Sequence, residues 1–111
     1  MSGDSSASGA AMIWCPFPDE TIAEAVAGTL VEEKLVACAN ILGAMKSVFA
    51  WEGKLQTSSE CGVLFKSSSA GLARAVQRIE ELHPYDTPAI MGWNCGGAPA
   101  RTKDWIADCV R

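Results

Sequence analysis

Two segments of short apolar and β-branched residues flank the tetrapeptide Trp51-Glu52-Gly53-Lys54, within a stretch that runs from Val36 to Ser67. Such segments are typical of β-strands, and a two-residue connection between them predicts a hairpin. Gly53 can adopt a positive φ without a Cβ clash, so Glu52 and Gly53 are predicted to form the turn and Trp51 and Lys54 to close it.

Counting outward from this turn sets the register of the hairpin. A β-bulge would shift the pairing by one residue, and Gly43 and Gly62 are the positions where we expect it. Three cross-strand pairs follow from the count: Phe49 with Gln56, Met45 with Glu60, and Ile41 with Leu64.

The hairpin is long for a chain of this size. The fourteen residues from Cys38 to Trp51 would span roughly 46 Å as an extended strand. A compact chain of 111 residues has a diameter of only about 34 Å. The hairpin must therefore bend sharply or project, and because a two-stranded ribbon is marginal in water and has open edges, we interpret it as an assembly arm.

The remaining patterns complete an α+β domain. An apolar strand precedes a helix that has Asp19 or Thr21 as its N-cap. We expect the apolar stripe of this helix to face the sheet, and Gly28 to approach the sheet closely. Pro84 ends a second helix at His83, and a last core strand and a terminal helix follow. The order β-α-β-β-α-β plus a helix predicts the ferredoxin-like split βαβ fold, an antiparallel sheet with helices on one face. Outside the hairpin, we expect strands at 11–15 and 89–93, and helices at 70–82 and 102–110.

Residues 1–10 are small, polar and rich in Ser and Gly, so we expect a disordered tail before one domain over 11–111. The chain is 49% hydrophobic with a mean hydropathy of +0.12. Apolar surface beyond what a small core can bury usually enters an oligomer interface. Trp51 is expected to anchor that interface, with Glu52 and Lys54 solvated or paired across subunits.

Charge and cysteine usage exclude some partners. The net charge of −4 and the lack of a basic cluster argue against nucleic acid. The five cysteines are dispersed with no C-x-x-C pair, which favours reduced thiols in a cytosol-like compartment. No run approaches the roughly 18 apolar residues of a membrane span, and the N-terminus lacks a signal peptide's pattern. We therefore expect a cytoplasmic protein.

Four motifs give the chain a resemblance to a known family. They are Pro18-Asp19-Glu20, the segment from Leu30 to Asn40 (LVEEKLVACAN), the turn Trp51–Lys54, and the segment from Leu82 to Pro88 (LHPYDTP). In this order and spacing they resemble the CutA family of divalent-cation-tolerance proteins over about residues 12–111. The resemblance implies a cytoplasmic, ferredoxin-like homotrimer linked to tolerance of copper and other divalent metals.

The resemblance also implies a metal site. The copper ligands proposed for bacterial members fall on Cys15, at the end of the first strand, and on His83, just before Pro84-Tyr85. Leu82 stands where some members carry a second histidine, which leaves a weaker ligand set. Trp93-Asn94-Cys95 replaces a stretch that is usually more aliphatic, so the edge of the last strand is expected to differ.

Simpler roles for these residues remain open. Cys15 could be a small buried residue at a strand end, and His83 could cap a helix. Beside metal tolerance, the chain could be a trimeric sensor that binds a small ligand in clefts between subunits, or a structural or anchoring trimer. A Cys15–His83 nucleophile pair would lack two features: a third group that orients the histidine, and an oxyanion loop. We therefore expect a non-catalytic protein.

Overall fold

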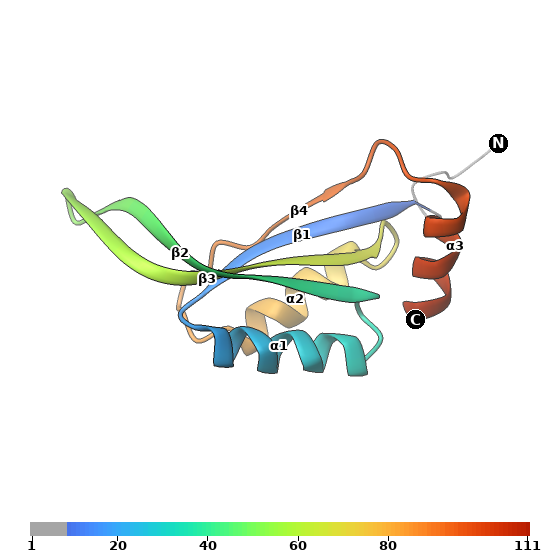
Figure 1. The fold of residues 1–111 in the computed structure, drawn as a ribbon, viewed down its shortest axis with the longest axis horizontal. Helices are drawn as coiled ribbons and strands as arrows, with labels where there is room; N and C mark the ends of the chain where they lie inside the picture. The colour runs from blue at the N-terminus through green and yellow to red at the C-terminus, as the bar shows by residue number, and fades with distance from the viewer. Residues whose placement is uncertain (1–8) are drawn as a thin grey trace.

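The computed structural model describes residues 9–111, which form an α+β fold (Figure 1). The four strands hydrogen-bond in the order β2-β3-β1-β4, and every neighbouring pair is antiparallel. This is the predicted ferredoxin-like arrangement. The elements, in chain order, are β1 (Ala10–Phe17), α1 (Glu20–Glu32), β2 (Cys38–Trp51), β3 (Lys54–Ser68), α2 (Leu72–Leu82), β4 (Met91–Asn94) and α3 (Ala100–Cys109).

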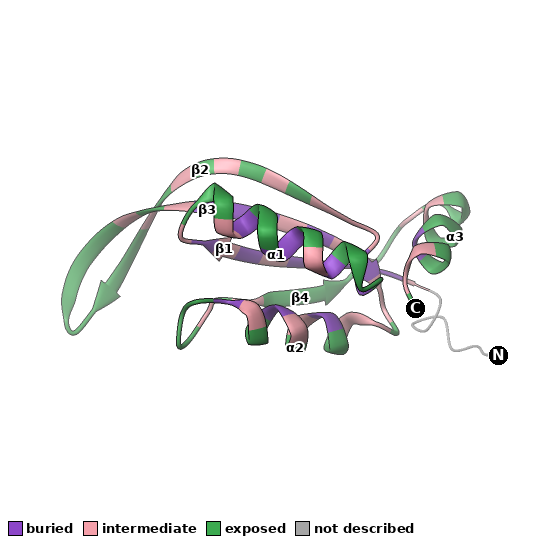
Figure 2. Ribbon diagram, turned by 90° about the horizontal axis from the view of Figure 1, so that it is seen from below, coloured by how far each residue is buried: buried purple, intermediate pink, exposed green. Residues whose placement is uncertain are grey.

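The hydrophobic core lies between the sheet and helices α1 and α2, which cover one of its faces (Figure 2). The strand β1 alternates, as a strand with one covered face should. Ile13, Cys15 and Phe17 are fully buried, while Met12 and Trp14 on the other face are partly exposed.

The helix α1 places its predicted apolar stripe against the sheet. It contributes four buried residues to the core, which are Ala23, Val26, Ala27 and Leu30. Gly28, however, is exposed, and a Cβ atom at this position would meet nothing from the sheet within 4 Å. The expected close approach of Gly28 to the sheet is therefore wrong, because this glycine lies on the outer face of the helix.

The hairpin of β2 and β3 has the predicted turn and register. Glu52 and Gly53 both have positive φ, at 50° and 75°, which is the pattern of a type I′ turn. Phe49 pairs with Gln56 and Met45 with Glu60, as counted from the turn. A bulge between Ile41 and Gly43 shifts the next pair by one, so that Ile41 faces Val63.

The hairpin projects beyond the domain, as its length predicts. The molecule measures 50 × 27 × 22 Å, and its radius of gyration is 15.0 Å. Figure 1 shows the tip of the hairpin extending well past the ends of α1 and α2. We call the part of the hairpin from Met45 to Glu60 the arm.

Several boundaries differ from those expected. The strand β1 begins at Ala10, which pairs with Ser68, one residue before the expected strand 11–15; residues 1–8 of the expected tail lie outside the described part. The strand also continues through Pro16, which is tolerated because β4 pairs with β1 only as far as Trp14 and no partner there needs the missing N–H.

The C-terminal elements are also shifted. Helix α2 begins at Leu72 instead of 70, because the Ser68 hydroxyl accepts a hydrogen bond from the Gly71 N–H and forms a turn before the helix. The strand β4 covers 91–94 instead of 89–93, and all four of its residues are exposed, so it is an edge strand and not a core strand. In α3, Ile106 is buried as expected, but Trp105 is exposed.

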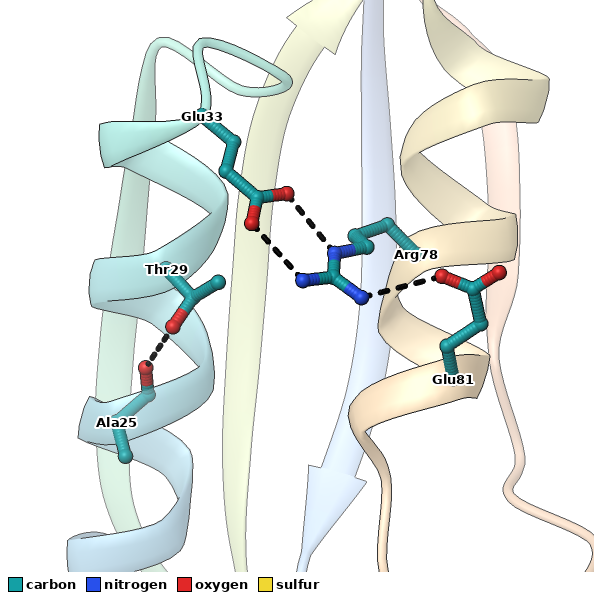
Figure 3. A network of polar contacts seen from close by, with 5 residues as sticks. All are labelled: Ala25, Thr29, Glu33, Arg78 and Glu81. Atoms are coloured by element: carbon teal, nitrogen blue, oxygen red, sulfur yellow. Dashed lines mark hydrogen bonds and ion pairs between the residues drawn. The ribbon is translucent and has the colours of Figure 1, made fainter.

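One ion-pair group joins the two helices that cover the sheet. The Arg78 guanidinium on α2 donates to both carboxylate oxygens of Glu33, at 2.8 and 2.9 Å, and to Glu81 at 3.2 Å (Figure 3). The hydrogen bond and charge of Arg78 hold the pKa of Glu33 below its usual value. The figure also shows the Thr29 hydroxyl donating to the Ala25 carbonyl oxygen within α1. Among residues 9–111, no helix is long and apolar enough to cross a membrane.

Candidate metal site

The candidate ligands Cys15 and His83 come from different elements that meet at one end of the sheet. Cys15 lies near the end of β1, on the face that the helices cover. His83 is the C-cap of α2, and its backbone is extended (φ −75°, ψ 136°) because Pro84 disfavours the helical conformation at the preceding residue. The extended turn directs the His83 ring back toward the end of β1.

Both side chains hydrogen-bond the same backbone atom. The Cys15 Sγ atom lies 3.5 Å from the carbonyl oxygen of Pro16, and His83 Nε2 lies 2.8 Å from that oxygen. The fold therefore brings the two residues together. Metal binding by them stays a prediction.

The hydrogen bonds of His83 assign its tautomer. The backbone N–H of Tyr85 donates to Nδ1 at 3.2 Å, so Nδ1 carries a lone pair and no proton. The proton of the neutral ring is then on Nε2, which donates it to the Pro16 carbonyl oxygen. The ring is buried and contacts two aromatic rings: it stacks on Phe17 at 4.6 Å and 18°, and is tilted against Tyr85 at 4.8 Å and 48°. Both nitrogens of the His83 ring thus have partners.

The Cys15 thiol is fully buried, and this changes its acidity. Burial raises the pKa of Cys15 to about 12, and the negative charge of Glu60 acts in the same direction. The thiolate is the form that ligates metals. At neutral pH the side chain is a thiol, and an incoming cation would have to displace its proton.

Tyr85 and Glu60 are part of the site, and the sequence did not single them out for it. The Tyr85 hydroxyl donates to the Glu60 carboxylate at 2.9 Å, which ties the loop after α2 to the base of the arm. Burial, followed by the hydrogen bond to Glu60 and its charge, raises the pKa of Tyr85 to about 12. Tyr85 belongs to the fourth sequence motif, so that motif was the available signal. Glu60 could be placed only through the register of the arm.

The donor types suit a soft cation, but the set is small. A thiolate and an imidazole are appropriate ligands for copper or zinc. Within residues 9–111, no group of three or more His, Cys, Asp or Glu side chains is arranged to hold a metal ion. Leu82, where a second histidine would complete the set, is partly buried and packs against the core instead. By donor type, Cys15 and His83 are two ligands of an incomplete site, and binding requires that the Cys15 proton and the Tyr85 N–H be displaced.

The other sequence-predicted positions lie elsewhere. All five cysteines are free: Cys61 is buried in the core, and Cys38, Cys95 and Cys109 are partly buried. Trp51, Glu52, Gly53 and Lys54 form the tip of the arm and are exposed, Trp51 to 63%. They do not belong to the Cys15–His83 site.

Comparison with known proteins identifies the family. The model of the family described as "CutA1 divalent ion tolerance protein" matches residues 11–109. The chain belongs to the CutA1 family. It is 32% identical to the divalent-cation tolerance protein CutA of Pectobacterium atrosepticum over 92% of this chain and 93% of that protein. It is 41% identical to the CutA of Pyrococcus horikoshii over 72% of this chain and 78% of the relative.

Solved CutA1 structures share the fold described above. The CutA1 of Ehrlichia chaffeensis superimposes with a TM-score of 0.88 at 32% identity, covering 91% of this chain and 94% of that one. The CutA of Xylella fastidiosa gives a TM-score of 0.89 at 28% identity, covering 93% and 99%. The predicted family and its ferredoxin-like fold are therefore confirmed.

Proposed function

We propose that this CutA1-family protein is a cytoplasmic homotrimer that binds copper or another soft divalent metal through Cys15 and His83 and catalyses no reaction. The observation that carries the metal proposal is the convergence of the Cys15 thiol and the His83 imidazole on the Pro16 carbonyl oxygen. Two donor side chains from separate elements thus lie side by side, and a thiolate with an imidazole suits soft cations.

The chemistry of these residues sets the form of binding. The pKa of Cys15 is raised to about 12, so binding at neutral pH releases the thiol proton and strengthens about tenfold for each unit that the pH rises. Because Leu82 supplies no donor, water or a group of a neighbouring chain would complete the coordination. We expect a modest affinity.

Exposed apolar side chains support the trimer. In the isolated chain the arm exposes large apolar residues, and the edge strand β4 exposes more; they are Val48, Phe49, Trp51, Leu55, Met91 and Trp93. Within residues 9–111, both outer strands, β2 and β4, also have an unpaired edge. A closed ring of three subunits would let each arm pack on the next subunit, with Trp51, Glu52, Gly53 and Lys54 in the interface, and would leave no free edge.

Free thiols support the cytoplasmic location. All five cysteines are unpaired, which is the usual state in a reducing compartment. The homologous structure from Archaeoglobus fulgidus bears the description "periplasmic", so cell fractionation is the direct test. The small-ligand alternative also has an observation in its favour: both ring nitrogens of His83 are already hydrogen-bonded. A trimer could instead hold an organic ligand in clefts between subunits or act as a structural anchor.

Calorimetric titration tests the metal proposal. The full chain is titrated with Zn²⁺ and, without oxygen, with Cu⁺, beside Cys15→Ser and His83→Ala variants that remain folded by circular dichroism. We expect both variants to lose most of the binding heat, whereas Cys38→Ser, a change at a partly buried cysteine outside the site, keeps it. Equal binding by all four proteins would place the metal elsewhere. A thermal-shift screen with nucleotides and organic acids tests the alternative.

A further inference from the structure

The lone pair of the His83 ring is covered by the segment that follows α2. Nε2 carries the proton and directs it at the Pro16 carbonyl oxygen, so it cannot donate electrons to a cation. Nδ1 has the lone pair, and the backbone N–H of Tyr85 occupies it at 3.2 Å. Any electrophile that reaches His83, a metal ion included, must first displace that N–H.

Tyr85 is held in this place at two further points. Its ring contacts the His83 ring, with 4.8 Å between the centroids. Its hydroxyl donates to the Glu60 carboxylate at 2.9 Å, and Glu60 belongs to β3, at the base of the arm. Tyr85 is nevertheless 39% exposed, so its hydrogen bond to Glu60 lies at the surface and not in the core.

We propose that Tyr85 is a latch on His83: its N–H covers the ring nitrogen Nδ1, its hydroxyl fastens the 84–87 segment to Glu60, and a cation reaches the lone pair of His83 only when this segment moves away from the ring. The proposal rests on the metal site proposed above and adds how that site is controlled. Because Glu60 lies at the base of the arm, opening the latch also frees a carboxylate at the point where the arm leaves the sheet.

The latch predicts by how much the apparent dissociation constant for a cation changes. When the competent form is a small fraction of the molecules, the apparent dissociation constant rises by the inverse of that fraction. Removing the Tyr85–Glu60 hydrogen bond should increase the open fraction by about three- to tenfold, the factor that corresponds to the net contribution of one typical hydrogen bond. Affinity for a cation and reactivity of the His83 lone pair should both increase by that factor.

His83 is the one histidine of the sequence, and this permits a test that needs no metal. Diethyl pyrocarbonate acylates an imidazole nitrogen that has a free lone pair, and peptide mass analysis separates His83 from other modified residues. We expect Tyr85→Phe and Glu60→Ala to react about three- to tenfold faster than the parent chain. Glu60→Gln, which keeps an oxygen acceptor for the hydroxyl, should stay close to the parent rate.

Glu81→Gln is the matched control, because Glu81 is a nearby carboxylate on α2 that pairs with Arg78 and not with Tyr85. It should react at the parent rate. Equal His83 reactivity in Tyr85→Phe, Glu60→Ala and the parent would overturn the latch, as would an equal acceleration in Glu81→Gln, which would indicate general loosening.

Cd²⁺ titration of the same variants tests metal binding directly. The ultraviolet absorption of cadmium–thiolate bonds follows the binding. The part of the signal that Cys15→Ser removes belongs to the site, and its apparent dissociation constant should fall in Tyr85→Phe by the factor seen for acylation. If Cys15→Ser removes no signal while His83 acylation still accelerates, the latch is supported and the metal role is not. If the signal depends on Cys15 but neither measurement responds to Tyr85→Phe, the latch is wrong and the metal site stands.

Discussion

Nε2 of His83 and Sγ of Cys15 lie 2.8 and 3.5 Å from one atom, the carbonyl oxygen of Pro16. One donor comes from the C-cap of α2 and the other from β1, at the end of the sheet where the arm begins. Burial keeps the thiol protonated, and the Tyr85 N–H occupies Nδ1 of the imidazole. At the proposed metal site, a cation must therefore compete with a proton on Cys15 and with the Tyr85 N–H on His83.

The buried thiol should make the protein sensitive to alkali. The unfolded chain loses the Cys15 proton above about pH 8.5, while the folded chain keeps it until the pKa of about 12. The contribution of Cys15 to stability is thus complete below about pH 8.5 and declines by about 1.4 kcal/mol for each pH unit above it. Tyr85, whose pKa is also raised to about 12, acts in the same direction at higher pH.

Urea unfolding of the parent chain and of Cys15→Ala, repeated from about pH 8 to about pH 11, measures this contribution. The variant is expected to be less stable at neutral pH because of its cavity, but its free energy of unfolding should fall less steeply with pH. Parallel curves for the two proteins would show that Cys15 does not hold its proton in the folded state.

The turn at the tip of the arm should not tolerate a β-branched residue. Gly53 has a φ of 75°, and Gly53→Val would cost about 1–3 kcal/mol per subunit. The melting temperature should fall, and assembly should weaken because the tip lies in the proposed interface. Glu52→Asn is the matched control: Glu52 also has a positive φ, at 50°, and asparagine accepts that conformation more readily, so this variant should be as stable as the parent or more so. An unchanged melting temperature for Gly53→Val would refute the role given to the turn.

The base of the arm depends on a glycine under a tryptophan. A Cβ atom on Gly62 would overlap the Trp14 ring and lie 3.1 Å from Met45 Sδ. Gly62→Ala should therefore destabilise the protein by about 1–3 kcal/mol through overpacking. Trp14→Leu together with Gly62→Ala should cost less than the sum of the two single changes, since leucine vacates the space. Strict additivity in this double-mutant cycle would contradict the contact.

The fold was predictable from sequence to the extent that local patterns determine it. The turn at Glu52-Gly53, the bulge near Gly43 and the projecting arm follow from strand length and glycine placement, and the structure has all three. Errors arose where tertiary context decides. β1 runs through Pro16 because β4 is short, and β4 itself is an edge strand whose apolar residues are exposed.

The candidate site was predictable only in part. A family motif and a strand end pointed to His83 and Cys15, and the fold brings them to one carbonyl group. Local sequence cannot reveal that the Tyr85 hydroxyl reaches Glu60, because that contact depends on the register of β3 against β1. Gly28 shows the same limit: a glycine within a helix indicates close packing only if it lies on the buried face, and this one is exposed.

The end of α1 offers a stabilising change with an internal control. Lys34 follows the helix with a φ of 62°, and its N–H bonds the Val31 carbonyl oxygen while the Leu35 N–H bonds that of Leu30. This left-handed position favours glycine, so Lys34→Gly should raise the free energy of unfolding by about 0.5–1 kcal/mol. The same substitution inside α3, Lys103→Gly, should lower it by about 1 kcal/mol. Thermal unfolding decides, and a loss of stability in both variants would contradict the prediction.

The most direct test of the metal site and the trimer is a crystal of the full chain soaked in copper, with anomalous data collected at the copper edge. The account predicts three subunits around a threefold axis, each with an anomalous peak at the Cys15 and His83 side chains, and the Tyr85 N–H displaced from the His83 ring. A map in which copper is bound at other groups and the Cys15–His83 pair has no peak would contradict it.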